Sequence, residues 1–336
     1  MALQYTYGKL YTADNVDLAS YLQDQEFPMI EVYNKHSSTF DWRGLLCQDD
    51  DEEVKMFGLP AMNRFKKMGP HEEPFLFGHT TGQYQQFVNK FGGGFARTRE
   101  FLARATSADL LKQAEEALDM DMRAIRYEIL KSIFNPPSYG HGFYNKTWDS
   151  LSGQSAPPNY EANSFNGSHN HYIVTGTATI TSIDPFIDAK QHIREHMSVK
   201  GKFRGFINSL QQGEVEKLAG WYNTSGPQVA NPLTDQTTID NWTVSLSGID
   251  FEVDDNIPAG YTVILYANGE KPIKFHELKN PSFRGLQLIP GPEANYPIIG
   301  SHYERYFMPR VWRRDAGAVL QWATNTNMYT VPTFYA

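Results

Sequence analysis

Apolar and polar positions follow several patterns along this chain, and the longest regular one lies between 106 and 134. Apolar residues recur there at steps of three and four, which places them on one stripe of a helix. Thr106 with Asp109 gives a capping signal at the start, and Asn135-Pro136-Pro137 ends the pattern. A helix of about 28 residues, roughly 40 Å long, is therefore predicted. The stripe consists of Leu110, Leu111, Ala114, Ala117, Leu118, Met122, Ile125, Ile129 and Ile133.

Strand patterns dominate the second half of the chain, where β-branched and aromatic residues alternate with polar ones. A first strand is expected over 171–180, and Asp184-Pro185 then starts a helix that runs to His196. A further short helix is expected near 214–219. The later expected strands are 243–246, 260–267, 273–275, 286–289, 310–312, 318–323 and 328–331.

The first third of the chain lacks such regularity. Residues 1–48 are polar with scattered aromatics, which predicts an extended arm containing a short helix over 13–22. The acidic run 49–53 is expected to be a solvated turn, because it lacks the ligand spacing of a calcium loop. From 54 to 104 aromatic, basic, glycine and proline residues alternate, which predicts a long projecting hairpin. Within it, Gly92–Gly94 is interpreted as a flexible hinge.

Composition narrows the class of protein. The chain has 336 residues, 40% of them hydrophobic, which is enough to bury a sizeable core. Its net charge of −8 argues against a general nucleic-acid coat protein. The single cysteine, Cys47, excludes an intrachain disulfide and a cysteine-built metal site. With no apolar run long enough for a membrane span and no signal-peptide pattern, we expect a soluble chain without a membrane partner.

Catalytic motifs are sparse. His192 and His196 are four residues apart on a predicted helix, so their imidazoles could share a metal. His169 and His171 precede a strand and could complete the ligand shell. The order His-Ile-Arg-Glu-His departs from His-Glu-x-x-His, and no carboxylate is obviously placed to orient each imidazole. Surface or interface histidines are therefore favoured, and a metal-dependent hydrolase using these four histidines stays as an alternative.

Two small basic clusters, Lys66-Lys67 and Arg97, Arg99 and Arg104, flank the predicted hairpin and long helix. Against a net charge of −8 they are expected to form salt bridges to acidic neighbours rather than to bind nucleic acid. We expect no catalytic residue, no cofactor and no metal, and hence a protein that is not an enzyme.

The order of these pieces resembles the major capsid protein of tailed bacteriophages, the Hong Kong 97-like family. An aromatic arm, a long hairpin, an unusually long helix, an α/β region and returning strands follow one another in both. The C-terminal residues 303–321, with Ala316-Gly317-Ala318-Val319-Leu320-Gln321, and the segment Met328-Tyr329-Thr330-Val331-Pro332 are similar to the closing strands of that family. The segments 184–196 and 258–272 are similar as well.

The resemblance implies an α+β Hong Kong 97-like capsid fold in five regions. These are an N-terminal arm over 1–53, an extended loop (a long β-hairpin) over 54–104, a peripheral domain with a spine helix over 105–139, mainly an axial domain over 140–285, and C-terminal strands of the peripheral domain over 286–336. No long charged helical segment stands ahead of the arm, so a separate scaffolding protein is implied.

The resemblance also implies self-assembly into hexamers and pentamers, which form an icosahedral head shell around double-stranded DNA. Such a protein is assembled in the host cytoplasm and resides in the virion, with a portal, a scaffold and a decoration protein as further partners and only non-specific contact with DNA. An encapsulin-type nanocompartment shell shares the fold and stays as an alternative. Assembly would bury aromatics that an isolated hairpin cannot bury. The candidate contacts between subunits are Trp42, Phe57, Phe65, Lys66, Lys67, Phe75, Phe77, Arg97 and Arg99.

Overall fold

The chain folds into two compact units, each built from segments far apart in the sequence. Unit 1 comprises Met1–Val54, Gln85–Ile129 and Lys274–Pro309, and unit 2 comprises Lys55–Tyr84, Leu130–Ile273 and Arg310–Ala336. The computed structural model describes residues 10–51, 54–58, 81–85, 88–136, 142–146, 165, 169–196, 202–218, 221–223, 243–267, 270–290, 298–324 and 328–335.

The predicted long helix is confirmed as α5 (Ser107–Phe134), which has 28 residues. Its start is capped as expected, because the amide and hydroxyl of Thr106 donate to the Asp109 carboxylate at 2.9 and 2.8 Å. Asp14 adds a second cap from the N-terminal segment by accepting the Ser107 amide at 3.1 Å. The apolar stripe faces the protein interior, with Leu110, Ala114 and Ile129 fully buried.

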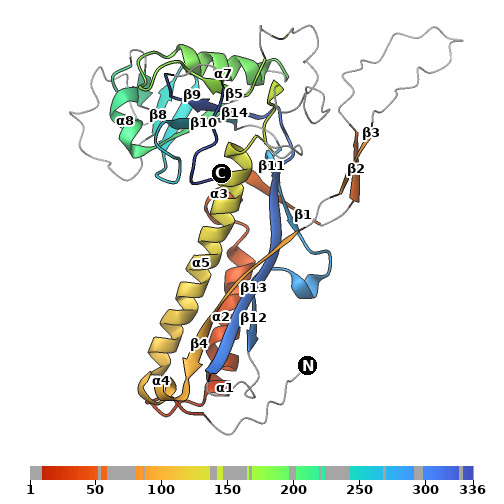
Figure 1. Cartoon of the computed structure of the whole chain (residues 1–336), viewed down its shortest axis with the longest axis vertical. Coiled ribbons are helices and arrows are strands. Elements are labelled where there is room, and N and C mark those ends of the chain that lie inside the picture. Colours follow the sequence, from red (N-terminus) through yellow and green to blue (C-terminus); the bar gives the residue numbers. More distant parts are fainter. Residues whose placement is uncertain are drawn as a thin grey trace, which may run out of the picture. The chain divides into compact units, whose positions relative to one another are not determined.

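The N-terminal segment is helical. The short helix expected over 13–22 is present in part, at 18–21, and the expected extended arm is wrong for residues 23–46. The elements of this segment are α1 (Leu18–Tyr21), a π-helical turn (Leu22–Glu26), α2 (Phe27–His36) and α3 (Asp41–Leu46). The π-helical turn shifts the helical register, so the apolar positions do not recur at a constant step. Ile30 and Tyr33 of α2 are buried with Ala117 of α5 and with Tyr303. Figure 1 shows α2 running beside α5.

The sheet of unit 1 is organised around one long strand, β13 (Ile298–Val311), of 14 residues. The expected strand 310–312 is only its end. Along one path the strands are β1 (Cys47–Asp51), β11 (Ile273–Glu277), β13 and β12 (Gln287–Pro290). In addition β4 (Asn89–Thr98) pairs antiparallel with β13, from Thr98 opposite Ile298 to Asn89 opposite Phe307.

The flexible hinge expected at Gly92–Gly94 is wrong, because all three glycines lie in β4 opposite Glu304–His302. A Cβ atom on Gly92 or Gly94 would lie 2.8 Å from a backbone carbonyl oxygen of β13. The glycines therefore allow close approach of two strands rather than bending.

The acidic run is also not a solvated turn over Asp49–Asp51, which belongs to β1. Asp49 lies 2.9 Å from Arg43, Asp50 lies 3.2 Å from Lys274, and Asp51 pairs with Arg284. Two of these cations come from more than 200 positions away in the sequence, so the local pattern gave no sign of them.

The expected hairpin is present in part. The strands β2 (Val54–Gly58) and β3 (Thr81–Gln85) pair in a two-stranded sheet. The rest of the expected span is used differently, since β4 belongs to the sheet of unit 1 and α4 (Arg99–Arg104) follows it. The hairpin is therefore shorter than the predicted range 54–104.

Unit 2 contains a seven-stranded mixed sheet. In spatial order its strands are β5 (Tyr172–Val174), β14 (Gly317–Gln321), β10 (Tyr261–Tyr266), β6 (Phe203–Ile207), β9 (Ile249–Val253), β8 (Thr243–Leu246) and β7 (Trp221–Asn223). Every residue of β14 is buried, as a strand with two neighbours requires. Residues 310–336, which were expected in the peripheral domain, belong to unit 2. There the Tyr329 hydroxyl donates to the carbonyl of Phe134, the last residue of α5, at 2.8 Å.

Two helices cover this sheet, α7 (Asp184–Arg194) and α8 (Ser209–Val215). Phe186, Ala189 and Ile193 of α7 are fully buried against Phe251 and other sheet residues. Asn208 caps α8 by accepting the Leu210 amide at 3.0 Å, so this helix begins earlier than the expected span 214–219.

Two expected strands also differ from the structure. The strand expected over 171–180 is only the three residues of β5. No strand forms over the described residues 328–331. Among the helices that the structure describes, none combines the length and apolar character needed to cross a membrane.

Candidate functional site

The sequence-predicted contact residues divide into three groups. Trp42 and Arg97 are buried within unit 1, with exposed fractions of 2% and 1%, so neither side chain offers surface to another subunit and both predictions are corrected. Phe57 lies in β2 and Arg99 is the first residue of α4. The remaining candidates, which lie outside the described residues, are Phe65, Lys66, Lys67, Phe75 and Phe77.

Burial of Arg97 is compensated by polar partners. Its Nε donates to Gln113 Oε1 at 3.1 Å, and its Nη2 lies 3.8 Å from Glu26 Oε2. The Tyr303 hydroxyl donates to the same Glu26 carboxylate. Burial raises the pKa of Glu26, while Tyr303 and Arg97 act in the opposite direction. The expected salt bridge to an acidic neighbour is thus confirmed for Arg97.

A second buried charge network centres on Arg305 of β13. Its Nη1 donates to Asp121 Oδ2 at 2.8 Å and its Nη2 to Glu277 Oε1 at 3.0 Å. The Tyr33 hydroxyl donates to the same Asp121 oxygen at 2.7 Å. Arg43 lies 3.6 Å from the other oxygen of Glu277 and above the Phe275 ring. These contacts connect α2, α3, α5, β11 and β13 within unit 1.

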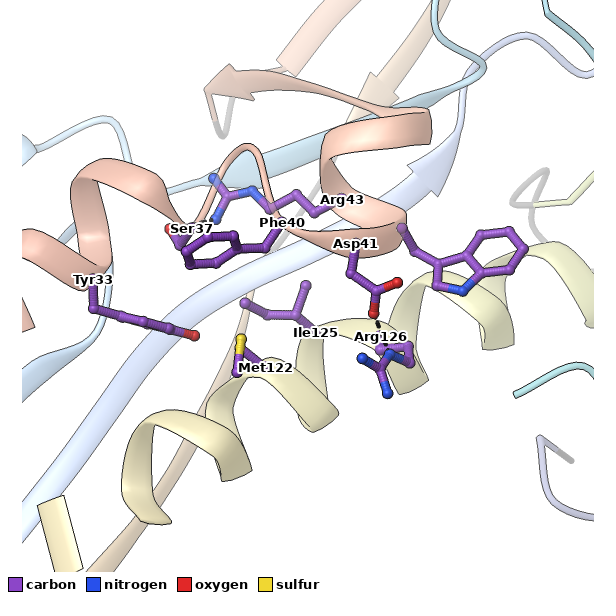
Figure 2. Close-up of a pocket in the computed structure, with 9 residues that line it drawn as sticks. Tyr33, Ser37, Phe40, Asp41, Arg43, Met122, Ile125 and Arg126 are labelled. Atoms are coloured by element: carbon purple, nitrogen blue, oxygen red, sulfur yellow. Dashed lines mark hydrogen bonds and ion pairs between the residues drawn. The ribbon is translucent and has the colours of Figure 1, made fainter. Parts of the chain in front are cut away.

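A small cavity lies between α2, α3 and α5 (Figure 2). Tyr33, Phe40, Met122 and Ile125 give it a mainly apolar lining. Its volume of about 20 Å³ holds one water molecule at most, so it is not a ligand site. The Asp41–Arg126 ion pair drawn in Figure 2 fastens α3 to α5 beside it.

Unit 2 brings together three of the four histidines that the sequence singled out, and we call His169, His171 and His196 the histidine cluster. The His169 and His196 Nε2 atoms are 2.7 Å apart, and each lies 3.2 Å from the Nε2 atom of His171. All three side chains are buried. His192 packs beside the cluster, but its Nδ1 atom lies 2.7 Å from the Asn170 carbonyl oxygen.

The Nδ1 atoms of His171 and His169 each lie close to an oxygen atom. His171 Nδ1 lies 2.6 Å from the Gly317 carbonyl oxygen. His169 Nδ1 lies 2.7 Å from Glu195 Oε2, a carboxylate that the sequence analysis had not assigned to any histidine. The Phe165 ring stacks on His169 with ring centroids 4.2 Å apart.

Burial and the neighbouring histidines favour the neutral forms of His169 and His171. Burial, together with the adjacent His196 and His192, lowers the pKa of His169 to about 3. The pKa of His171 is lowered well below its ordinary value for the same reasons. A hydrolytic metal needs an open position that water and substrate can reach. The burial of all three rings argues against the hydrolase alternative.

Sequence reasoning missed the exposed apolar side chains, because single apolar residues on a surface leave no periodic signal. Among the described residues they occur in both units, for example on α2 and α5 of unit 1 and on α8 and the C-terminal residues of unit 2. They include Phe27, Val32, Met120, Leu210, Met328 and Phe334.

Comparison of the sequence with known families and proteins finds no relative, since no protein-family model and no curated protein matches it. Comparison of structures does find similar chains. A protein of Mycobacterium phage Patience is 20% identical with a TM-score of 0.67, and the match covers 100% of this chain and 98% of that one.

Two further similar structures are described as capsids. The capsid of a native GTA particle is 12% identical with a TM-score of 0.55, covering 83% of this chain and 88% of that one. The capsid of Cyanophage P-SCSP1u is 10% identical with a TM-score of 0.52, covering 83% and 86%. The chain therefore has the α+β, Hong Kong 97-like fold of phage capsid proteins, as the sequence resemblance implied.

Proposed function

We propose that this chain is a major capsid protein that assembles into the hexamers and pentamers of an icosahedral phage head enclosing double-stranded DNA. The observation that carries the proposal is the structural similarity over the whole of this chain and nearly the whole of its phage counterpart. The GTA and cyanophage capsids support it with matches over 83% of the chain. On this proposal the protein is a virion component and has no enzymatic role.

The architecture supports specific domain assignments within this proposal. Unit 1 carries most of the long helix α5 and the long strand β13, and corresponds to the peripheral domain. Residues 130–273 and 310–336 of unit 2, with the seven-stranded sheet, correspond to the axial domain at the centre of a capsomer. The segment between β2 and β3 corresponds to the extended loop.

The contacts between subunits are assigned to two sets of residues. The first is the hairpin set, Phe57, Phe65, Lys66, Lys67, Phe75 and Phe77, with Arg99 at the start of α4. The second is the exposed apolar set on α2, α5, α8 and the C-terminal residues. Burying one such side chain contributes about 1.5–3 kcal/mol, and contacts repeated around a ring add up. A scaffolding protein, a portal and a decoration protein complete the list of partners.

The test is the mass and shape of the purified full-length chain, by light scattering and negative-stain microscopy. The proposal expects capsomer rings or closed shells, either from the chain alone or after co-expression with the product of the neighbouring open reading frame. A folded monomer or dimer under both conditions would contradict it. Shells from native particles that enclose an enzyme instead of DNA would assign the chain to the encapsulin alternative.

A further inference from the structure

The contacts of the histidine cluster in unit 2 indicate which ring nitrogen of each histidine carries a proton. A neutral imidazole has one N–H and one nitrogen with a bare lone pair. His171 Nδ1 faces a carbonyl oxygen, which only accepts, so the proton of His171 is on Nδ1. His169 Nδ1 lies 2.7 Å from Glu195 Oε2 without hydrogen-bond geometry. A carboxylate oxygen that close would repel a bare nitrogen lone pair, so we assign the proton of His169 to Nδ1 as well. The Nε2 atoms of both residues therefore present lone pairs to the centre of the cluster.

His196 cannot satisfy both lone pairs. It supplies at most one proton at Nε2, and its Nε2 lies 2.7 Å from His169 and 3.2 Å from His171. The direct contact between the His169 and His171 Nε2 atoms, at 3.2 Å, then has no proton in it. Two facing lone pairs in a buried site repel each other, so hydrogen bonding alone does not explain the arrangement.

A single metal cation explains it. Three nitrogens spaced by 2.7 to 3.2 Å fit around one ion. Each nitrogen would lie about 2.0–2.1 Å from the ion, the usual Zn–N distance. The metal-binding form of histidine is the neutral one, which burial favours at this site.

The surroundings also have the features of a built site. Metal-bound histidines usually donate their other ring nitrogen to a carboxylate or a backbone carbonyl. Here the Gly317 carbonyl occupies that position for His171, and the Glu195 carboxylate lies 2.7 Å from His169 Nδ1 without hydrogen-bond geometry. The aromatic rings of Phe165 and Tyr144 flank His169 and limit the access of water.

We propose that His169, His171 and His196 bind one structural Zn²⁺ ion through their Nε2 atoms. The ion ties the residues at the start of β5 to the end of α7, and through His171 to β14. It stabilises unit 2 rather than acting on a substrate, because the cluster is buried. This role is independent of shell assembly, so either proposal can fail without the other.

The first experiment measures metal in tag-free full-length protein, because a histidine tag would itself bind zinc. After incubation with Zn²⁺ and desalting, we expect about one zinc per chain by elemental analysis. Removing the ion with EDTA should lower the midpoint of thermal unfolding by at least about 5 °C, and added Zn²⁺ should restore it. A folded protein holding less than about 0.1 zinc per chain would overturn the proposal.

Variants then assign the ligands. His169→Ala, His171→Ala and His196→Ala should each lose the bound zinc. The matched control is His192→Gln, in α7 beside the cluster, and this variant should keep the bound zinc. The variant Glu195→Gln should keep the fold but bind zinc about 10- to 100-fold more weakly. Equal loss of zinc in His192→Gln would overturn the three-histidine assignment. If an alanine variant fails to fold, the reversible effect of EDTA on the wild-type protein decides.

Discussion

Arg305 illustrates how a single residue holds unit 1 together. Its side chain is 1% exposed, and it neutralises Asp121 and Glu277, which are themselves buried. Arg305→Met keeps much of the volume but leaves two buried carboxylates without their cation. We expect the free energy of unfolding to fall by about 3–5 kcal/mol, measured by urea denaturation.

The control for Arg305 is Arg123→Ala. Arg123 pairs with Asp119 one turn away on α5, but both side chains are exposed to solvent. Exposed pairs contribute little because water screens them, so this variant should unfold close to the wild-type midpoint. If both variants lost the same unfolding free energy, the buried ion pairs of Arg305 would contribute no more to stability than the exposed pair of Arg123.

Asp14 predicts a pH dependence. Hydrogen bonds from the Ser107 and Thr12 hydroxyls lower the pKa of Asp14 to about 2. Between that value and the unfolded pKa near 3.8, the unfolded chain binds more protons than the folded one. The stability that Asp14 contributes is therefore present above pH 3.8 and is lost as pH falls towards 2.

Asp14→Asn tests this dependence in urea denaturation at two pH values. The variant should be less stable than the wild type at pH 6, and the difference should shrink by pH 3. The exposed Asp24→Asn is the control, and its effect should not follow the same course. If the difference in unfolding free energy between the wild type and Asp14→Asn were the same at pH 6 and pH 3, the pH dependence assigned to Asp14 would be wrong.

At the scale of elements, the pairing of β4 with β13 depends on where its glycines lie. A Cβ on Gly94 would lie 2.8 Å from the Ser301 carbonyl oxygen, whereas a Cβ on Gly93 would meet nothing within 4 Å. Gly94→Ala should therefore cost about 1–3 kcal/mol of unfolding free energy through overpacking. Gly93→Ala should be neutral or stabilising by about 0.5–1 kcal/mol, because glycine weakens strands. Similar effects of the two changes on thermal unfolding would contradict the register in which β4 pairs with β13.

Elements with one uninterrupted periodicity could be predicted from the sequence. The stripe of α5 and its cap at Thr106 depend only on residues near one another, and both are confirmed. The helices after residue 22 were missed because a π-helical turn breaks the period. The strand β1 was missed because Lys274 and Arg284, which neutralise its carboxylates, are remote in the sequence.

In the candidate site, too, local spacing could be predicted from the sequence, and tertiary contacts could not. The pairs His169/His171 and His192/His196 were visible from their spacing alone. Helical spacing put His192 in the set, but His196 lies just past the end of α7, and its ring joins His169 and His171, which precede β5. The position of Glu195 beside His169 could not be predicted, because it follows from tertiary structure.

For the whole molecule, subunit stability and shell assembly are separate properties. Trp42 is buried in unit 1, so Trp42→Ala should lower the free energy of unfolding of the subunit by about 3–5 kcal/mol. Phe77 belongs to the hairpin set that we assign to contacts between subunits. The variant Phe77→Ala should leave the unfolding midpoint of the unassembled subunit unchanged and should raise the protein concentration needed to form shells.

These two variants separate subunit stability from shell assembly. Trp42→Ala should change the stability of the unassembled subunit, and Phe77→Ala should change only the concentration at which shells form. Thermal unfolding of unassembled protein reports the subunit, and sedimentation across a concentration series reports the shell. Assembly depends on mass action, so losing one apolar contact in every subunit shifts the threshold even when each contact is weak. If Phe77→Ala lowered subunit stability as much as Trp42→Ala, Phe77 would be a core residue. If it assembled at the wild-type concentration, the hairpin would not be the element that joins subunits.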